Sequence, residues 1–324
     1  MSKGITCLAL CTLLFVVCLS AEAQQPKRIP RIGYLTLASL SANLPRRDAF
    51  LEGLRNVGYL EGENIMIEYR YADSQAERLP ELAADLARLK VDVIVAGGTQ
   101  VNLVAKKVTA TIPIVMANAD DPVGSGLIEN LARPGGNVTG LSSMSVELNS
   151  KRLELFKEAF PKLHSLAVIW YTASNPAFRE TQVAAQALGL KIRSLEVRRA
   201  EDLDSTFALI TRERPDGFFP VTSAFMSANR KPIVDFAAKN RLPALYPNRE
   251  YVEDGGLMSY AANIYAMHRR AATYVDRILK GAKPADLPVE QPTEFELLIN
   301  LKTAKQIRVT IPASVLAQAD KVIK

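Results

Sequence analysis

Two short apolar segments rich in β-branched residues, Val91–Val95 and Ile112–Met116, constrain the fold of this chain most. About a dozen residues with a helical pattern join them, a length that suits a helix crossing over between two parallel strands. Runs that are apolar at every position indicate strands buried on both faces. The sequence therefore predicts a β-α-β unit in a parallel sheet, and ligands of such sheets bind at the carboxyl ends of the strands.

The residues that follow these two strands are small or polar. Gly97-Gly98-Thr99 precedes a predicted helix, where free backbone N–H groups suit an anion. The same glycines also fit an ordinary tight strand-to-helix turn. Asn118 and Asp120 offer oxygen acceptors that suit a cation, whereas Asp121-Pro122 fits the N-cap and first position of a helix. We therefore expect Asn118 and Asp120 to face a ligand.

The first residues have the layout of a cleavable secretory signal, 1–23. Lys3 precedes an apolar core from Ile5 to Leu19, and the small-x-small site Ala21-Glu22-Ala23 follows. The three cysteines, Cys7, Cys11 and Cys18, all lie within this segment, so we expect a mature periplasmic protein without disulfide or thiol chemistry. A lipid anchor on Cys18 is disfavoured because Val17 is bulky. No other segment is apolar enough to span a bilayer.

The rest of the chain alternates strands with helices in two similar halves, which predicts an α/β protein with parallel sheets in two Rossmann-like lobes. We expect a first lobe over 28–142, completed by about 264–290, and a second over 143–263, completed by about 291–324, joined by a multi-strand hinge that begins at Ser142–Ser145. Expected strands are 31–37, 65–71, 91–95, 112–116, 138–140, 165–170, 191–197, 217–221, 244–246, 256–260 and 295–300. Expected helices are 49–56, 76–89, 150–160, 177–188, 201–212, 227–240 and 264–279.

Further candidate ligand contacts follow other strands. They are Ser39 and Leu40 in the first half and Trp170, Tyr171, Thr222, Ser223, Tyr246, Asn248 and Tyr260 in the second. Trp170 is the only tryptophan, and it fits equally a core position and a flat wall for an apolar or aromatic ligand.

Several function classes are disfavoured. The net charge of +6 comes from scattered basic pairs such as Arg46-Arg47, which solvated helix faces explain better than a nucleic-acid groove. The sequence contains no Gly-x-Ser-x-Gly, His-Glu-x-x-His, Walker or Gly-x-Gly-x-x-Gly motif. Its two histidines, His164 and His268, fit solvated or capping roles better than catalysis. We expect no enzyme activity, cofactor or metal.

Several motifs together resemble the family of uncharacterised ABC transporter substrate-binding proteins. They include Tyr59-Leu60-Glu61-Gly62-Glu63-Asn64, Arg133-Pro134-Gly135-Gly136-Asn137-Val138-Thr139-Gly140, Gly255-Gly256-Leu257-Met258-Ser259-Tyr260 and Ile278-Leu279-Lys280-Gly281-Ala282-Lys283-Pro284. The resemblance implies a type I periplasmic-binding-protein fold, with three crossovers between the lobes and a ligand in the cleft. Some relatives are linked to aromatic amino acid uptake.

The sequence thus predicts a monomeric receptor that closes two lobes around a small molecule and passes it to an ABC permease. The expected ligand is an amino acid with an apolar or aromatic side chain, its carboxylate on the amides of Gly97 to Thr99 and its ammonium on Asn118 or Asp120. A receptor that signals without transport, and a secreted α/β enzyme acting in the same cleft, remain the alternatives.

Overall fold

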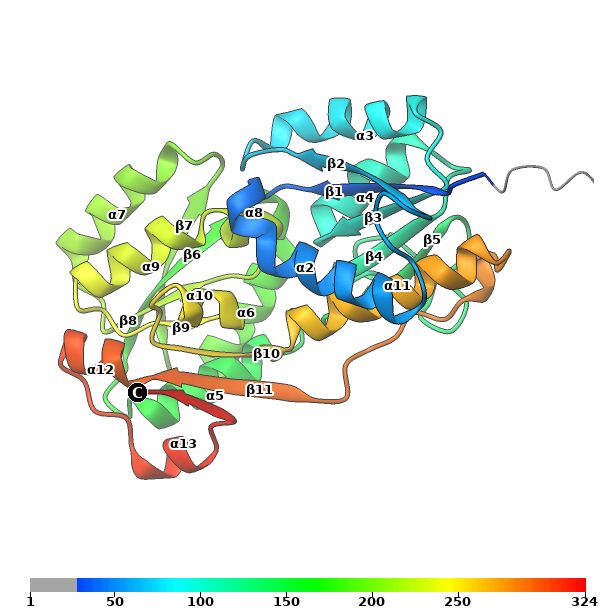
Figure 1. Cartoon of the computed structure of the whole chain (residues 1–324). Coiled ribbons are helices and arrows are strands. Elements are labelled where there is room, and N and C mark those ends of the chain that lie inside the picture. The colour runs from blue at the N-terminus through cyan, green and yellow to red at the C-terminus, as the bar shows by residue number, and fades with distance from the viewer. Residues whose placement is uncertain (1–27) are drawn as a thin grey trace, which may run out of the picture.

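The computed structural model describes residues 28–324, so the predicted signal peptide and its cysteines lie outside the described residues. The described part forms two α/β lobes (Figure 1). The first lobe has one parallel sheet in the order β2-β1-β3-β4-β5. Its elements are β1 Arg31–Thr36, α2 Leu40–Asn56, β2 Met66–Tyr71, η2 Ala76–Arg78, α3 Leu79–Arg88, β3 Val93–Gly97, α4 Thr99–Val108, β4 Ile114–Ala119 and β5 Val138–Ser142, with α11 Ile264–Leu279 and η4 Pro284–Asp286 from later in the chain.

Helices cover both faces of this sheet, as its continuous apolar strands require. Ile32 and Tyr34 of β1 point into a core shared with α2 and α11, whereas Leu35 points into a core shared with α3 and α4. The helices α2 and α11 pack side by side (Figure 1), and Gly53 permits this because a Cβ there would lie 2.2 Å from the carbonyl oxygen of Arg269.

The second lobe contains two adjoining sheets, ordered β7-β6-β8 and β12-β11-β10-β9, joined by a bridge between Phe218 and Ala244. Its strands are β6 Ser165–Tyr171, β7 Lys191–Val197, β8 Gly217–Pro220, β9 Leu245–Tyr246, β10 Met258–Ala262, β11 Phe295–Asn300 and β12 Lys321–Ile323. Its helices are α5 Asn149–Ala159, η3 Thr172–Ser174, α6 Asn175–Ala187, α7 Asp202–Glu213, α8 Ala224–Ala228, α9 Arg230–Lys239, α10 Arg249–Glu253, α12 Leu301–Ile307 and α13 Ala313–Ala317.

The chain passes between the lobes three times: after β5, after β10 and before β11. Since β10 leaves the second lobe and β11 returns to it, these strands pair antiparallel, which corrects the expectation of wholly parallel sheets. The helix expected over 227–240 is also wrong, because the chain breaks at Asn229 into α8 and α9. Within the described residues, no helix is both long and apolar enough to cross a membrane.

Candidate ligand-binding site

A polar cavity lies between the lobes, at the carboxyl ends of the strands in the first lobe. Asn118 lies inside β4 because this strand ends at Ala119, three residues later than the sequence predicts. The hinge segment after β5 contributes serines, and loops of the second lobe close the opposite side. The lining side chains that can hydrogen-bond are those of Arg46, Asn118, Asp120, Ser143, Ser145, Thr222, Ser223, Ser227 and Asn248.

Asp120 lies at the centre of this arrangement. Its carboxylate accepts hydrogen bonds from the hydroxyls of Thr222 at 3.2 Å, Thr99 at 3.3 Å and Ser143 at 3.4 Å. Thr99 belongs to the first lobe, Ser143 to the hinge and Thr222 to the second lobe. Burial raises the pKa of the Asp120 carboxyl, although these hydroxyls and the charge of Arg152 oppose the shift. A carboxylate desolvated in this way gains strongly from a cationic partner.

Arg152 supplies the positive charge behind the cavity. Its side chain is 0 % exposed, and its guanidinium donates to the carbonyl oxygens of Ser145 at 2.6 Å, Tyr260 at 2.8 Å and Pro247 at 3.0 Å. Burial lowers the pKa of Arg152 to about 10, and the negative charge of Asp120 opposes that shift. Arg152 therefore ties together the segments that form the hinge side of the cavity.

A second, larger cavity adjoins the first and shares Asp120, Thr222, Ser223 and Ala224 with it. It encloses about 230 Å³, against about 40 Å³ for the polar cavity. Its other walls are mostly apolar and comprise Leu103, Val146, Tyr171, Ala173, Pro176 and Ala177, with Thr99, Gln100, Asp121, Ser125 and Ser174 at the edges. The cleft thus combines a polar compartment with an apolar one.

Tyr171 forms one wall of the apolar cavity. Its ring stacks on Phe225, with the ring centroids 4.5 Å apart. Its hydroxyl accepts a hydrogen bond from Gln100 of the first lobe at 3.3 Å. Because Tyr171 lies in the second lobe, this bond spans the cleft, and the structure holds the lobes in a closed arrangement.

Gly98 allows the lobes to approach closely. Its φ of +89° suits glycine, and a Cβ on it would lie 2.8 Å from the Cβ of Ala224 in the second lobe. Its N–H donates to the carbonyl oxygen of Asn118 at 2.9 Å. The amide of Gly98 is therefore not free to bind an anion, which corrects part of the prediction for Gly97 to Thr99.

Most of the predicted contact residues come together in the two cavities: Gly98, Thr99, Asn118, Asp120, Tyr171, Thr222, Ser223 and Asn248. Gly97 lines a small neighbouring cavity with Arg46 and Arg230. Asp121 does not begin a helix as expected; its carboxylate accepts from the N–H of Gly124 at 2.8 Å, in a turn.

The structure does not bring the remaining predicted residues into these cavities. Trp170 points to the opposite face of β6 from Tyr171, stacks on Phe178 and donates to Ser194 at 2.9 Å. Tyr246 is buried against Tyr251, with 1 % of its surface exposed. Tyr260 is half-buried and packs against the core of the second lobe, and its carbonyl oxygen accepts from Arg152.

The two candidates at the start of α2 also have other roles. The Ser39 hydroxyl caps this helix by accepting from the N–H of Ala42 at 3.4 Å. Leu40 is 48 % exposed and points to solvent. Both follow the carboxyl end of β1, as predicted, but lie outside the cavities.

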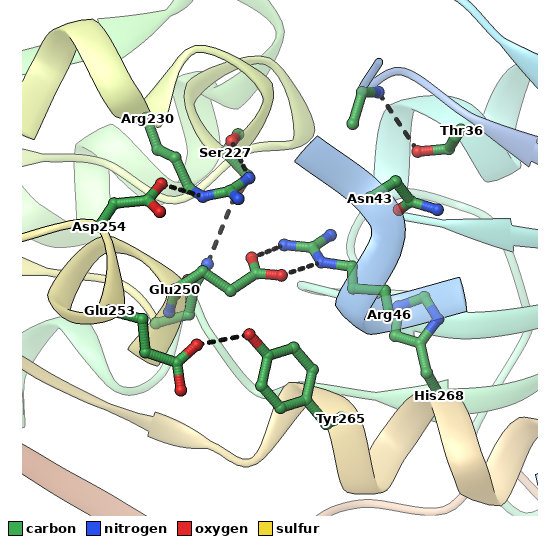
Figure 2. Close-up of polar contacts among 12 residues, drawn as sticks. Thr36, Asn43, Arg46, Ser227, Arg230, Glu250, Glu253, Asp254, Tyr265 and His268 are labelled. Carbon is green, nitrogen blue, oxygen red and sulfur yellow. Dashed lines mark hydrogen bonds and ion pairs between the residues drawn. The ribbon is translucent and has the colours of Figure 1, made fainter. Parts of the chain in front are cut away.

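Arg46 is the principal cleft residue that the sequence analysis missed, because it was assigned to a solvated helix face. Its guanidinium makes a two-point contact with Glu250 of the second lobe, with Nε 2.7 Å from Oε1 and Nη2 bound to Oε2 (Figure 2). The side chains are 11 % and 1 % exposed. Burial acts to raise the pKa of Glu250, but the charge and hydrogen bonds of Arg46 hold that pKa below its ordinary value.

Ser143, Ser145, Gln100, Ala224 and Ser227 were also missed. The hinge assignment of Ser142–Ser145 carried a usable signal for two of them, since a segment that crosses between lobes borders their cleft. Gln100 is the second residue of α4 and Ala224 is the first residue of α8, each directly after a candidate residue, so the predicted stretches were too short.

The histidines take different positions. His164 is exposed, whereas His268 is 2 % exposed and its Nδ1 lies 3.4 Å from the hydroxyl of Tyr34. The solvated or capping role expected for His268 is therefore wrong. Burial, and to a smaller extent the charge of Arg46, lowers the pKa of His268 well below its ordinary value. Across residues 28–324, no group of three or more His, Cys, Asp or Glu side chains is arranged to hold a metal ion.

Comparisons with known proteins agree with this geometry. A tyrosine-binding protein of Clostridioides difficile (strain R20291) is 26% identical over 286 residues, which are 87% of this chain and 81% of that protein. The structure of a conserved domain protein from Vibrio cholerae has a TM-score of 0.85 at 28% identity, covering 91% of this chain and 100% of the other. The ABC domain from Streptococcus pneumonia in complex with L-Trp has a TM-score of 0.82 at 25% identity, covering 91% and 99%.

The predicted type I periplasmic-binding-protein fold is confirmed. The model of the ABC transporter substrate binding protein family matches residues 32–323, which include both lobes and the cleft. The chain therefore belongs to the ABC transporter substrate-binding protein family, whose members bind small molecules outside the cytoplasm and interact with ABC permeases rather than act as enzymes.

Proposed function

We propose that this protein binds an amino acid with an apolar or aromatic side chain between its lobes and delivers it, as a monomer, to an ABC permease for import. The observation that carries this proposal is the position of Asp120. Its carboxylate borders both a polar and an apolar cavity, so a ligand with a cationic group next to an apolar one fits across the junction.

The ammonium of the ligand would lie between Asp120 and Asn118. The side-chain oxygen of Asn118 is buried and has no hydrogen-bond partner among the described residues. A buried acceptor without a donor costs about 1–3 kcal/mol, and an ammonium has three donors. Binding there would satisfy Asn118 and neutralise the desolvated Asp120.

The carboxylate of the ligand would face the other wall of the polar cavity, where Arg46, Ser223 and Ser227 offer donors. Nε and Nη2 of Arg46 bind Glu250. The third guanidinium nitrogen, Nη1, makes no hydrogen bond among the described residues and can donate to the ligand. Charge-assisted bonds of this type are the strong ones in such sites.

The side chain of the ligand would fill the apolar cavity beside Tyr171. An aromatic ring gains both from burial and from offset packing against another ring. The relatives named for tyrosine and solved with L-Trp support an aromatic amino acid. Because the walls come from both lobes, such a ligand would favour the closed arrangement over the open one.

A calorimetric panel of amino acids, neutral sugars and purines tests this function. We expect one or more apolar or aromatic amino acids to bind, and Asp120→Asn to weaken that binding by about 100-fold or more. Asp92→Asn is the matched control. Asp92 precedes β3 at the amino ends of the strands of the same sheet, away from the cleft, and its carboxylate accepts a hydrogen bond from the N–H of Arg31. Tight binding of a sugar without any response to amino acids, or equal losses in both variants, would contradict the proposal.

The two alternative functions have their own signatures. Conversion of the bound amino acid into a product, followed by mass spectrometry, would support a secreted enzyme. A binding protein that feeds an importer should stimulate ATP hydrolysis by its permease and ATPase only when the amino acid is present. Binding without that stimulation would favour a signalling receptor.

A further inference from the structure

A buried ion pair connects the lobes beside the cleft. Arg46 lies on α2 of the first lobe and Glu250 on α10 of the second, 204 residues apart in sequence (Figure 2). Glu250 is 1 % exposed and Arg46 is 11 % exposed. In the closed arrangement, the two charges are therefore shielded from water and share a two-point contact.

Opening the lobes would separate these two groups and return both to water. The attraction between them then contributes to the difference between the closed and open states and not to the folding of either lobe. Close charge pairs at interfaces mainly affect the rate of dissociation when one partner is removed. We expect the same effect on the rate of opening where two lobes of one protein meet around a ligand.

Neighbouring residues fix Glu250 in place. The Asn248 side chain caps α10 by accepting from the N–H of Glu250 at 3.2 Å. Close by, Arg230 pairs with Asp254 at 2.8 Å within the second lobe. The hydroxyl of Tyr265, at the start of α11, donates to Glu253 of α10 at 2.5 Å (Figure 2). The short helix α10 therefore presents Glu250 to the first lobe in a defined position.

The pair also borders the ligand cavity without Glu250 being part of it. Arg46 lines the polar cavity, as does Asn248, which holds the start of α10. Glu250 is absent from the lining of both cavities. One edge of the Arg46 guanidinium is thus occupied by Glu250, which orients the rest of the group toward the cleft.

We propose that Glu250 is a positioning residue for ligand capture, which holds the lobes closed and orients Arg46 without touching the ligand. This inference rests on the proposed function for the part that concerns the ligand. The contact of α10 with the first lobe then slows the release of the ligand. Removing the charge of Glu250 should then change how long the ligand stays bound, and leave which ligand is bound unchanged.

The test is Glu250→Gln, compared with Glu52→Gln. Glu52 pairs with Arg269 at 2.8 Å, but both residues lie in the first lobe, so this control removes an ion pair that does not span the cleft. Stopped-flow fluorescence with the tightest-binding amino acid of the panel gives the two rate constants. We expect Glu250→Gln to raise the dissociation rate constant by about tenfold or more, to leave the association rate constant within about twofold, and to preserve the ranking of ligands. The control should match the wild type.

Small-angle scattering of the unliganded proteins makes the inference testable even if no amino acid binds. We expect Glu250→Gln to shift the mean radius of gyration toward the open form, and Glu52→Gln to leave it unchanged. Glu250→Asp keeps the charge and should restore part of the closure, which a merely structural role would not require. An unchanged radius of gyration and unchanged dissociation rate in a folded Glu250→Gln protein would overturn the inference.

Discussion

The ionisation of Asp120 links the site to pH. Binding of an ammonium requires the ionised carboxylate, and burial raises the pKa of Asp120 above its ordinary value of about 3.9. Affinity should therefore be constant at neutral pH and fall by up to about tenfold per pH unit below that raised pKa. Calorimetry from pH 7 downward checks this, and Asp120→Asn should show no such dependence. A wild-type affinity that stays flat as the pH falls to below about 3.9, the ordinary pKa of an aspartate, would contradict it.

The same shift has the opposite sign for stability. Since the folded protein binds this proton more tightly than the unfolded chain, the ionised carboxylate costs stability above its raised pKa. This cost shrinks as the pH falls from the raised pKa and is gone below the ordinary pKa that the group has in the unfolded chain. Asp120→Asn should accordingly keep or raise the midpoint of thermal unfolding at neutral pH. A loss of affinity with an unchanged or higher midpoint would therefore come from the lost ligand contact and not from a damaged fold.

Trp170 gives a contrasting prediction at the same scale. Its ring stacks on Phe178 with 4.6 Å between centroids and is 9 % exposed, so its role is packing. Trp170→Ala should cost about 3–5 kcal/mol of unfolding free energy, measured by denaturant titration. The fraction that remains folded should bind the ligand with unchanged affinity. A loss of affinity without a loss of stability would return Trp170 to the site.

At the scale of elements, the contact between α4 and α8 depends on Gly98. Gly98→Ala would introduce both a strained φ and a clash with Ala224, whereas Gly58→Ala introduces similar strain at φ +91° with no atom within 4 Å. Both variants should lose about 1–3 kcal/mol of stability. Only Gly98→Ala should also weaken ligand binding, because only it hinders closure; thermal melts and calorimetry on the two proteins check this. Equal affinities would show that closure tolerates the Cβ.

The regular elements could be predicted from sequence because their signals are local. The strand Lys191–Val197 and the helix Ile264–Leu279 have the predicted bounds, since apolar periodicity and caps act within a few residues. The helix α10 was missed because five residues are too few to show a period. Its partner Arg46 could not be assigned either, because the pairing with Glu250 depends on how two distant segments meet in space.

The candidate site shows the same division. Strand ends indicated Asn118, Asp120, Tyr171 and Thr222, since parallel strands bring their carboxyl ends to one edge. Sequence could not tell that Trp170 and Tyr171 point to opposite faces of β6, because both neighbours are aromatic and each face of that strand is buried. Which face borders the cleft is decided by the packing of the whole lobe.

In the proposed function, the two lobes of the molecule close on a zwitterion. Three chain crossings form the hinge, and Arg152 ties Ser145 of the first crossing to Pro247 and to Tyr260 of β10, the strand that leads into the second crossing. Closure brings Thr222 to Asp120 and Glu250 to Arg46. The hydroxyl of Thr222 thus reaches the carboxylate that we assign to the ammonium in the same arrangement that pairs Arg46 with Glu250.

Recognition of the ammonium by Asp120 is tested by removing the ammonium from the ligand. Calorimetry would compare the tightest-binding amino acid with its des-amino analogue, which keeps the side chain and the carboxylate. We expect the analogue to bind the wild type about 100-fold more weakly, and Asp120→Asn to abolish most of this difference. Equal affinity of the wild type for both compounds would contradict recognition of an ammonium by Asp120.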